Sequence, residues 1–157
     1  MVEIDLYPFR VHAIFSMRSW SRRTEPGTLL NREIYAIVGA EGFKRLAAAF
    51  YSQLPQDDLL GPMYPQDDME GAEQRLREFL IFLFGGPQTY IQLRGLPRLG
   101  ARHARFAVDQ AARDRWMQIM ENAFAKTALP PEVEQTMRKV FEQMSTSLIN
   151  QVVSGDR

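Results

Sequence analysis

The chain has 157 residues, 45% of them hydrophobic and 24% charged, and it contains no cysteine. This length is enough for one globular domain with a core or ligand cavity, and the lack of cysteine excludes thiolate metal sites and cysteine nucleophiles. Because 19 basic residues balance 19 acidic ones, a dedicated nucleic-acid binder and a polybasic membrane anchor are disfavoured. The two histidines, His12 and His103, are too few for a three-histidine zinc site.

The first 31 residues differ from the rest of the chain. They mix charged residues among the apolar ones, unlike a secretory signal peptide, and no later segment has the roughly 18 consecutive apolar residues of a membrane span. We therefore expect a cytoplasmic protein that does not enter a membrane. Apolar residues alternate over 2–6 and again over 9–15, which is typical of an extended arm lying on the domain or on a neighbouring subunit. A partly ordered tail is the alternative.

Two amphipathic helices are predicted in the first half of the remaining chain. Apolar residues at helical spacing predict a helix over 43–54, closed by a proline. A second helix is expected over 69–83, where Asp67 or Asp68 can cap its start and the glycines and proline at 85–87 end it. This second helix has the clearest apolar stripe in the chain.

The second half begins with a segment, 88–107, that glycine and proline interrupt, so short helical turns joined by loops are expected there. Asp109 is a candidate cap for the next long helix, which carries Trp116. The proline pair at 130–131 then starts a last helix with an apolar stripe up to Leu148.

Between Arg32 and Val153 the sequence contains no convincing strand pair, hairpin or internal repeat. We therefore predict an all-α domain over 32–153. An N-terminal extension over 1–31 precedes it, and a short tail over 154–157 follows.

His103 is the one histidine of the predicted helical domain, and Phe106 follows it by three positions. A lone histidine is more often an ordinary surface or core residue than a ligand. The chain also carries ten phenylalanines and eight methionines, however, and a helical body of this composition is suited to enclosing a large apolar cofactor. His103 is therefore a candidate metal ligand.

Several short motifs occur in a fixed order along the helical domain: Phe50-Tyr51, Met63-Tyr64-Pro65, the run from Gly71 to Leu80, the run from Gly85 to Tyr90, the run from Arg98 to Phe106, and Asp114-Arg115-Trp116. In this order and spacing they resemble the truncated haemoglobins of the second group. The resemblance extends from about residue 34 to residue 150 and does not cover the N-terminal extension.

The resemblance implies a two-over-two helical sandwich around haem b, with His103 as the proximal ligand of a five-coordinate iron. The other ring nitrogen of His103 is then expected to donate to a backbone carbonyl. Ala72 stands where many globins carry a distal histidine. Stabilisation of a bound ligand therefore falls to Tyr51, Tyr64 and Trp116, which can all donate hydrogen bonds.

Further contacts to the cofactor follow from the same resemblance. Arg75 or Arg102 is a candidate partner for a haem propionate, although solvated surface arginines would explain the same residues. Leu76 belongs to the helix stripe by its spacing and to the distal wall by the resemblance. The expected cofactor contacts besides His103 are Arg75, Leu76, Phe79, Tyr90, Arg102 and Phe106.

The implied function is reversible binding of oxygen, nitric oxide and carbon monoxide, with oxygen transport as a role and with sulfide or peroxide as further candidate ligands. Two alternatives stay open, and no catalytic residue is assigned. One is a haem-dependent enzyme, a peroxidase or a nitric oxide dioxygenase with a reductase partner. The other is a haem-free helical sensor or interaction module. A homodimer is the expected assembly, because the alternating N-terminal extension offers an apolar surface.

Overall fold

The computed structural model describes residue 29 and residues 31–151 of the chain. Regular structure in this part is helical throughout, as predicted, and none of its helices is long and apolar enough to cross a membrane. The predicted N-terminal arm, His12 and the C-terminal tail lie outside the described residues. The elements in chain order are α2 (Asn31–Tyr51), the 3-10 turns η1 (Leu54–Gln56) and η2 (Gly61–Met63), α3 (Met69–Leu83), α4 (Thr89–Arg94), α5 (Leu99–His103), α6 (Gln110–Thr127) and α7 (Pro131–Ser147).

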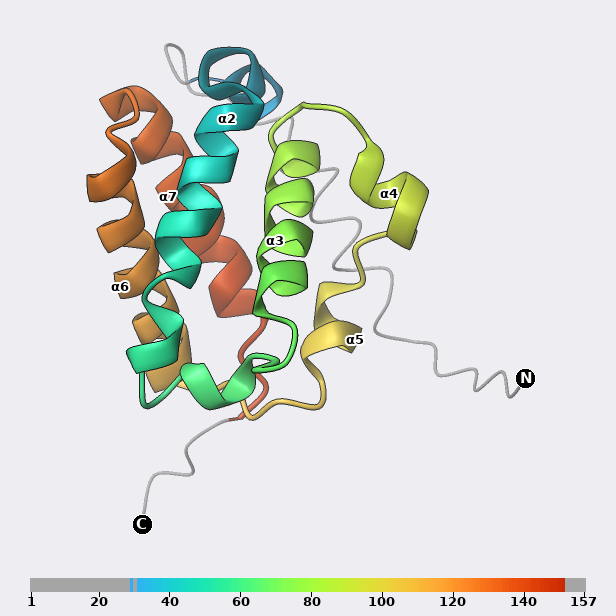
Figure 1. The fold of residues 1–157 in the computed structure, drawn as a ribbon, viewed down its shortest axis with the longest axis vertical. Helices are drawn as coiled ribbons and strands as arrows, with labels where there is room; N and C mark the ends of the chain where they lie inside the picture. The colour runs from blue at the N-terminus through green and yellow to red at the C-terminus, as the bar shows by residue number, and fades with distance from the viewer. Residues whose placement is uncertain (1–28, 30, 152–157) are drawn as a thin grey trace.

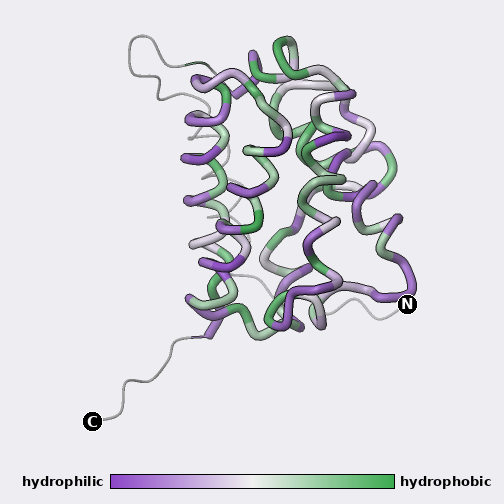
Figure 2. The backbone as a smooth tube through the Cα atoms, turned by 60° about the vertical axis from the view of Figure 1, so that its left-hand side comes forward, coloured by the Kyte–Doolittle hydropathy of each residue, from purple (hydrophilic) through white to green (hydrophobic). Residues whose placement is uncertain are grey.

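The four long helices α2, α3, α6 and α7 form the body of the molecule (Figure 1). Helix α2 packs against both α3 and α6, and α6 also packs against α7. The short helices α4 and α5 lie beside α3 at the edge of this bundle (Figure 1). Hydrophobic and hydrophilic residues alternate along the helix at the left of Figure 2, as expected for a helix that turns one face to a shared core.

Helix α2 begins earlier than the spacing predicts and contains a break. Gly39 has a φ of 67° and a ψ of 172°, so two helical segments meet there at a kink. The first segment packs against the end of α3, where the Tyr35 amide donates to the carbonyl of Phe84 over 3.0 Å. The ring of Phe43 then stacks between those of Tyr35 and Phe84, at 6.2 and 5.9 Å. The stripe at 43–54 identified the second segment alone, and its last turn is the 3-10 turn η1 rather than α-helix.

Helix starts follow the predicted capping chemistry. Asp68, rather than Asp67, caps α3 by accepting a hydrogen bond from the Gly71 amide over 3.2 Å. Asp109 caps α6 in the same way, accepting from the Ala112 amide over 2.8 Å. Pro131 occupies the first turn of α7, where its missing amide hydrogen costs no hydrogen bond.

Aromatic rings join α7 to α6 and to the end of α3. Phe141 on α7 contacts Phe84 at 5.8 Å, Phe124 at 6.1 Å and Trp116 at 5.4 Å, measured between ring centroids. The phenylalanines in this group are fully buried, and each such ring contributes roughly 2 kcal/mol or more of burial free energy. Trp116 is therefore anchored on its α7 side by the core.

Candidate cofactor pocket

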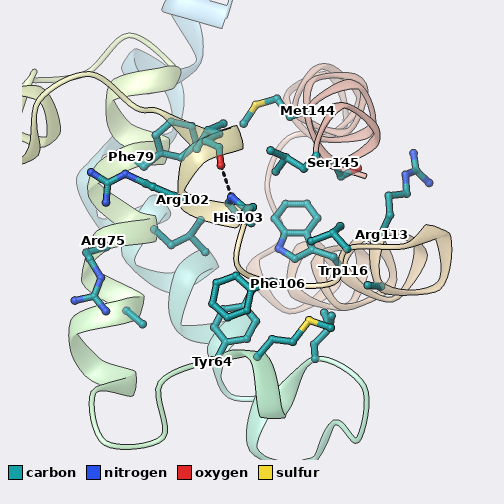
Figure 3. A pocket seen from close by; sticks show the side chains of 18 of the residues that line it. Tyr64, Arg75, Phe79, Arg102, His103, Phe106, Arg113, Trp116, Met144 and Ser145 are labelled. Carbon is teal, nitrogen blue, oxygen red and sulfur yellow. Dashed lines mark hydrogen bonds between the residues drawn. The ribbon is translucent and has the colours of Figure 1, made fainter. Parts of the chain in front are cut away.

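A cavity of about 340 Å³ opens among α3, α5, α6 and α7. Its walls are mostly apolar, with Leu76 and Phe79 from α3 and Met144 from α7 among them. This volume lies within the range of sites for small molecules and cofactors. Figure 3 shows side chains from the different helices converging on this space.

The structure brings every site residue predicted from the sequence to this one cavity. They come from α2, α3, α4, α5, α6 and the loops, and so are widely separated along the chain. The predicted residues that line the cavity are Tyr51, Tyr64, Ala72, Arg75, Leu76, Phe79, Tyr90, Arg102, His103, Phe106 and Trp116.

His103 is the last residue of α5 and is partly buried at the cavity wall. Its Nδ1 lies 2.7 Å from the carbonyl oxygen of Leu99 (Figure 3). Because a carbonyl oxygen can only accept, Nδ1 of the neutral ring carries the hydrogen and Nε2 keeps its lone pair. This is the tautomer that an imidazole needs in order to bind a metal through Nε2.

Three hydrogen-bond donors line the same cavity as His103: Tyr51 from α2, Tyr64 from the loop after η2, and Trp116 from α6. The rings of the two tyrosines meet edge to face at 5.6 Å, and the buried Phe50 supports Trp116 at 5.4 Å. The indole N–H of Trp116 lies close enough to the Tyr64 hydroxyl to lower the pKa of that hydroxyl. Because an indole can only donate, the Tyr64 oxygen is the acceptor in any bond between the two side chains, and the Tyr64 hydroxyl hydrogen is left to donate elsewhere.

Both tyrosines keep their hydroxyl hydrogens at neutral pH. Burial raises the pKa of Tyr64 to about 12, although the neighbouring Trp116 N–H acts in the opposite direction. Burial also raises the pKa of Tyr51 far above its usual value, and the neighbouring Tyr64 adds to that rise. The two hydroxyl groups can therefore serve as donors in this part of the cavity.

Asp57 ties the loop that leads to Tyr64 onto the helix of Trp116. Its carboxylate accepts from the Leu60 amide over 2.7 Å and from Nη1 of Arg115 over 2.7 Å, and its side chain is 7% exposed. Burial raises the pKa of Asp57, but these two partners outweigh burial and hold the pKa below its usual value. The sequence pattern did not predict this contact, because Asp57 and Arg115 lie 58 positions apart.

Arginines form a cationic rim on one side of the cavity. Arg75 on α3 pairs with Asp68 over 2.9 Å, and the Arg102 guanidinium on α5 lies 6.0 Å from the ring centre of Tyr90. Arg75 and Arg102 lie on the same side of the pocket in Figure 3. Arg105 also lines the cavity, although it was not among the predicted site residues. This rim can bind the carboxylates of a ligand.

The far wall of the cavity comes from α7 and the turn after it, which the sequence reasoning did not assign to a site. Met144, Ser145 and Leu148 line this wall. Met144 and Leu148 belong to the apolar stripe of the last predicted helix. Helical spacing marks such residues as facing inward, but it does not separate a packed core from the wall of a cavity.

The match to a known family extends over the whole helical domain. Residues 33–150 match the family model of the bacterial-like globins. The chain belongs to the bacterial-like globin family. This globin is similar to a group 2 truncated haemoglobin of Bacillus subtilis, with 30% identity over 123 residues that cover 78% of this chain and 92% of that protein.

Solved structures agree with this family assignment. A thermostable haemoglobin from the actinobacterium Thermobifida fusca is 41% identical, with a TM-score of 0.71 over 74% of this globin and 96% of that chain. The group II truncated haemoglobin from Bacillus anthracis is 26% identical, with a TM-score of 0.72 over 75% of this globin and 96% of that chain. The resemblance to the second group of truncated haemoglobins and the all-α truncated globin fold are both confirmed.

Proposed function

We propose that this globin holds haem b in the cavity among α3, α5, α6 and α7, with His103 as the proximal ligand, and reversibly binds oxygen and other diatomic molecules there. Haem supplies an iron centre for such ligands. The observation that supports the proposal most is the His103 ring at the cavity wall, with Nδ1 held by the Leu99 carbonyl over 2.7 Å and Nε2 available to a metal.

The residues around His103 fit a haem in three respects. The walls are largely apolar, as a porphyrin requires. The tautomer of His103 is set for coordination through Nε2. Arg75 and Arg102 on the rim offer guanidinium groups to the two propionates. Arg75 would then pair with both a propionate and Asp68.

The part of the cavity lined by Ala72 and the two tyrosines is suited to holding a small polar ligand. Ala72 is small, so it leaves room there, and it brings no side-chain nitrogen that could bind iron. Donation falls to Tyr51 and Tyr64, whose hydroxyl groups stay protonated at neutral pH. The Trp116 N–H lowers the pKa of the neighbouring Tyr64 hydroxyl, and its donation to the Tyr64 oxygen would polarise the Tyr64 O–H group and strengthen the bond that Tyr64 makes to a ligand.

The visible absorption spectrum of the purified protein tests this function. We expect a Soret band that changes position between the oxidised and reduced protein and again under oxygen and under carbon monoxide. A protein that shows no such band after reconstitution with haem would contradict the proposal and would favour a haem-free interaction module.

Changing Trp116 to phenylalanine is expected to make oxygen dissociate several-fold faster. The variant keeps an aromatic ring against Phe50 and Phe141 but loses the N–H that polarises Tyr64, and one neutral hydrogen bond is worth about 1 kcal/mol. Rapid mixing of the oxygenated protein with carbon monoxide measures the rate.

Two further variants test whether Trp116 acts on the ligand through Tyr64. Tyr64→Phe should also speed dissociation, and the double variant should be little faster than Tyr64→Phe alone, because Trp116 acts through Tyr64. Tyr35→Phe removes a hydroxyl outside the cavity and should leave the rate unchanged. Fully additive effects of the two changes would contradict the relay from Trp116 to Tyr64.

A further inference from the structure

The helix that carries His103 is poorly fixed by packing. Helix α5 has five residues, none of them buried, and its first turn has no side-chain cap. An isolated helix of this length is unstable in water. Something outside α5 must therefore hold His103 in place for its ring to meet a cofactor in one orientation.

Asn150, in the segment after α7, supplies such a hold. Its side-chain nitrogen Nδ2 donates to the carbonyl of His103 over 3.2 Å and to that of Phe106 over 2.9 Å. Its side-chain oxygen accepts from the Val108 amide over 2.9 Å. Both amide hydrogens of Nδ2 and the oxygen are thus committed to the loop that follows α5.

The backbone completes the same junction. The amides of Asn150 and Gln151 both donate to the carbonyl of Val108, over 2.9 and 3.1 Å. Side chain and backbone together join the end of α7 to the loop 103–108. Since these backbone bonds do not depend on the side chain, a change of side chain at position 150 leaves part of the junction intact.

We propose that Asn150 is a positioning residue that sets the location of the His103 ring, and hence the strength of its bond to iron. The proposal rests on the proposed role of His103 as the proximal ligand. Two hydrogen bonds then fix the position of the His103 ring. Nδ1 donates to the Leu99 carbonyl within α5, and the His103 carbonyl accepts from Asn150 in the segment after α7. Shifting either one moves Nε2 relative to the cavity.

Two variants of the full chain test this role. Asn150→Ala removes the three side-chain bonds. Asn150→Asp keeps an acceptor for the Val108 amide but turns an oxygen toward the carbonyls of His103 and Phe106, so it should disturb the loop at least as much. Asn122→Ala is the matched control, because it removes an exposed amide on α6 whose bond goes to Gln53 over 3.0 Å.

Three measurements apply to each variant. Amide hydrogen exchange of Val108 in the haem-free protein should be several-fold faster in Asn150→Ala, in which the Phe106 carbonyl at 3.1 Å remains as a second acceptor of this amide, and this tests the junction without any cofactor. Haem transfer to excess apomyoglobin should also be roughly tenfold faster, as for other residues that orient a metal ligand. The iron–histidine stretching band in the Raman spectrum of the reduced protein should shift or broaden in both Asn150 variants and stay unchanged in Asn122→Ala.

The outcomes separate this proposal from the function on which it rests. A native protein that lacks the iron–histidine band would overturn the role of His103, and this proposal with it. A native band that both Asn150 variants leave unchanged would overturn the positioning role alone, even if the variants were less stable. Faster exchange at Val108 together with a shifted band would support it.

Discussion

Replacing His103 by alanine is expected to abolish stable haem binding, with haem loss faster by at least about 100-fold. His103 is the one histidine within the part of the chain that the structure describes, and its ring lies at the wall of an apolar cavity. The fold should survive, because no residue of α5 is buried. The rate of haem transfer to apomyoglobin measures the effect, and far-ultraviolet circular dichroism checks the fold.

Added imidazole provides a positive control for this variant. If the missing group is the axial ligand alone, free imidazole should enter the space left by the side chain and restore the spectrum of the bound haem. Asn122→Ala should retain haem like the native protein. A His103→Ala protein with native spectrum and native haem retention would contradict the assignment of the ligand.

The second large effect is expected at Gly85, which ends α3. Its φ is +91°, and a Cβ atom there would lie 2.2 Å from the carbonyl oxygen and 2.5 Å from the Cα of Arg32. Backbone atoms at the start of α2 cannot move away without disturbing the core contact between Tyr35 and Phe84. Gly85→Ala should therefore lower the free energy of unfolding by about 3 kcal/mol, as measured by urea denaturation.

Two other glycines separate the clash from backbone strain. Gly95 also has a positive φ, +73°, but a Cβ there meets nothing within 4 Å, so Gly95→Ala should cost about 1 kcal/mol from strain alone. Gly100 lies in α5 with open space around it, and alanine there should be neutral or slightly stabilising. Equal losses for Gly85→Ala and Gly95→Ala would show that the clash with Arg32 is not the cause.

A helix boundary could be predicted where the residues that determine it lie close together in the sequence. The start of α6 could be predicted because a cap such as Asp109 acts within three or four residues. For α3 the same rule left Asp67 and Asp68 as equal candidates, and the observed bond to the Gly71 amide decides for Asp68. The kink at Gly39 was missed, because a single glycine inside a helical pattern is compatible with a straight helix as well as a bent one.

The cavity shows the same division between local and long-range information. The resemblance to truncated haemoglobins named His103, the two tyrosines and Trp116, and the structure brings them to one space. Neither helical spacing nor the resemblance pointed to Asp57 or Asn150. Asp57 binds Arg115, 58 positions away, and Asn150 binds His103, 47 positions away. Polar residues in loops carry no periodic signal that would reveal such contacts.

The sequence by itself therefore predicted the all-α class of the fold and most starts and ends of its main helices, and its resemblance to truncated haemoglobins pointed to His103 and to the aromatic side chains expected at the cavity. Helical spacing and capping depend on neighbours within one or two turns, so the residue pattern is sufficient for them. The tertiary structure alone decided which apolar residues of α7 line the cavity, which nitrogen of His103 keeps its lone pair, and how Asn150 holds the loop behind it. These features require segments distant in sequence to meet at hydrogen-bonding distance, and a local pattern does not encode that.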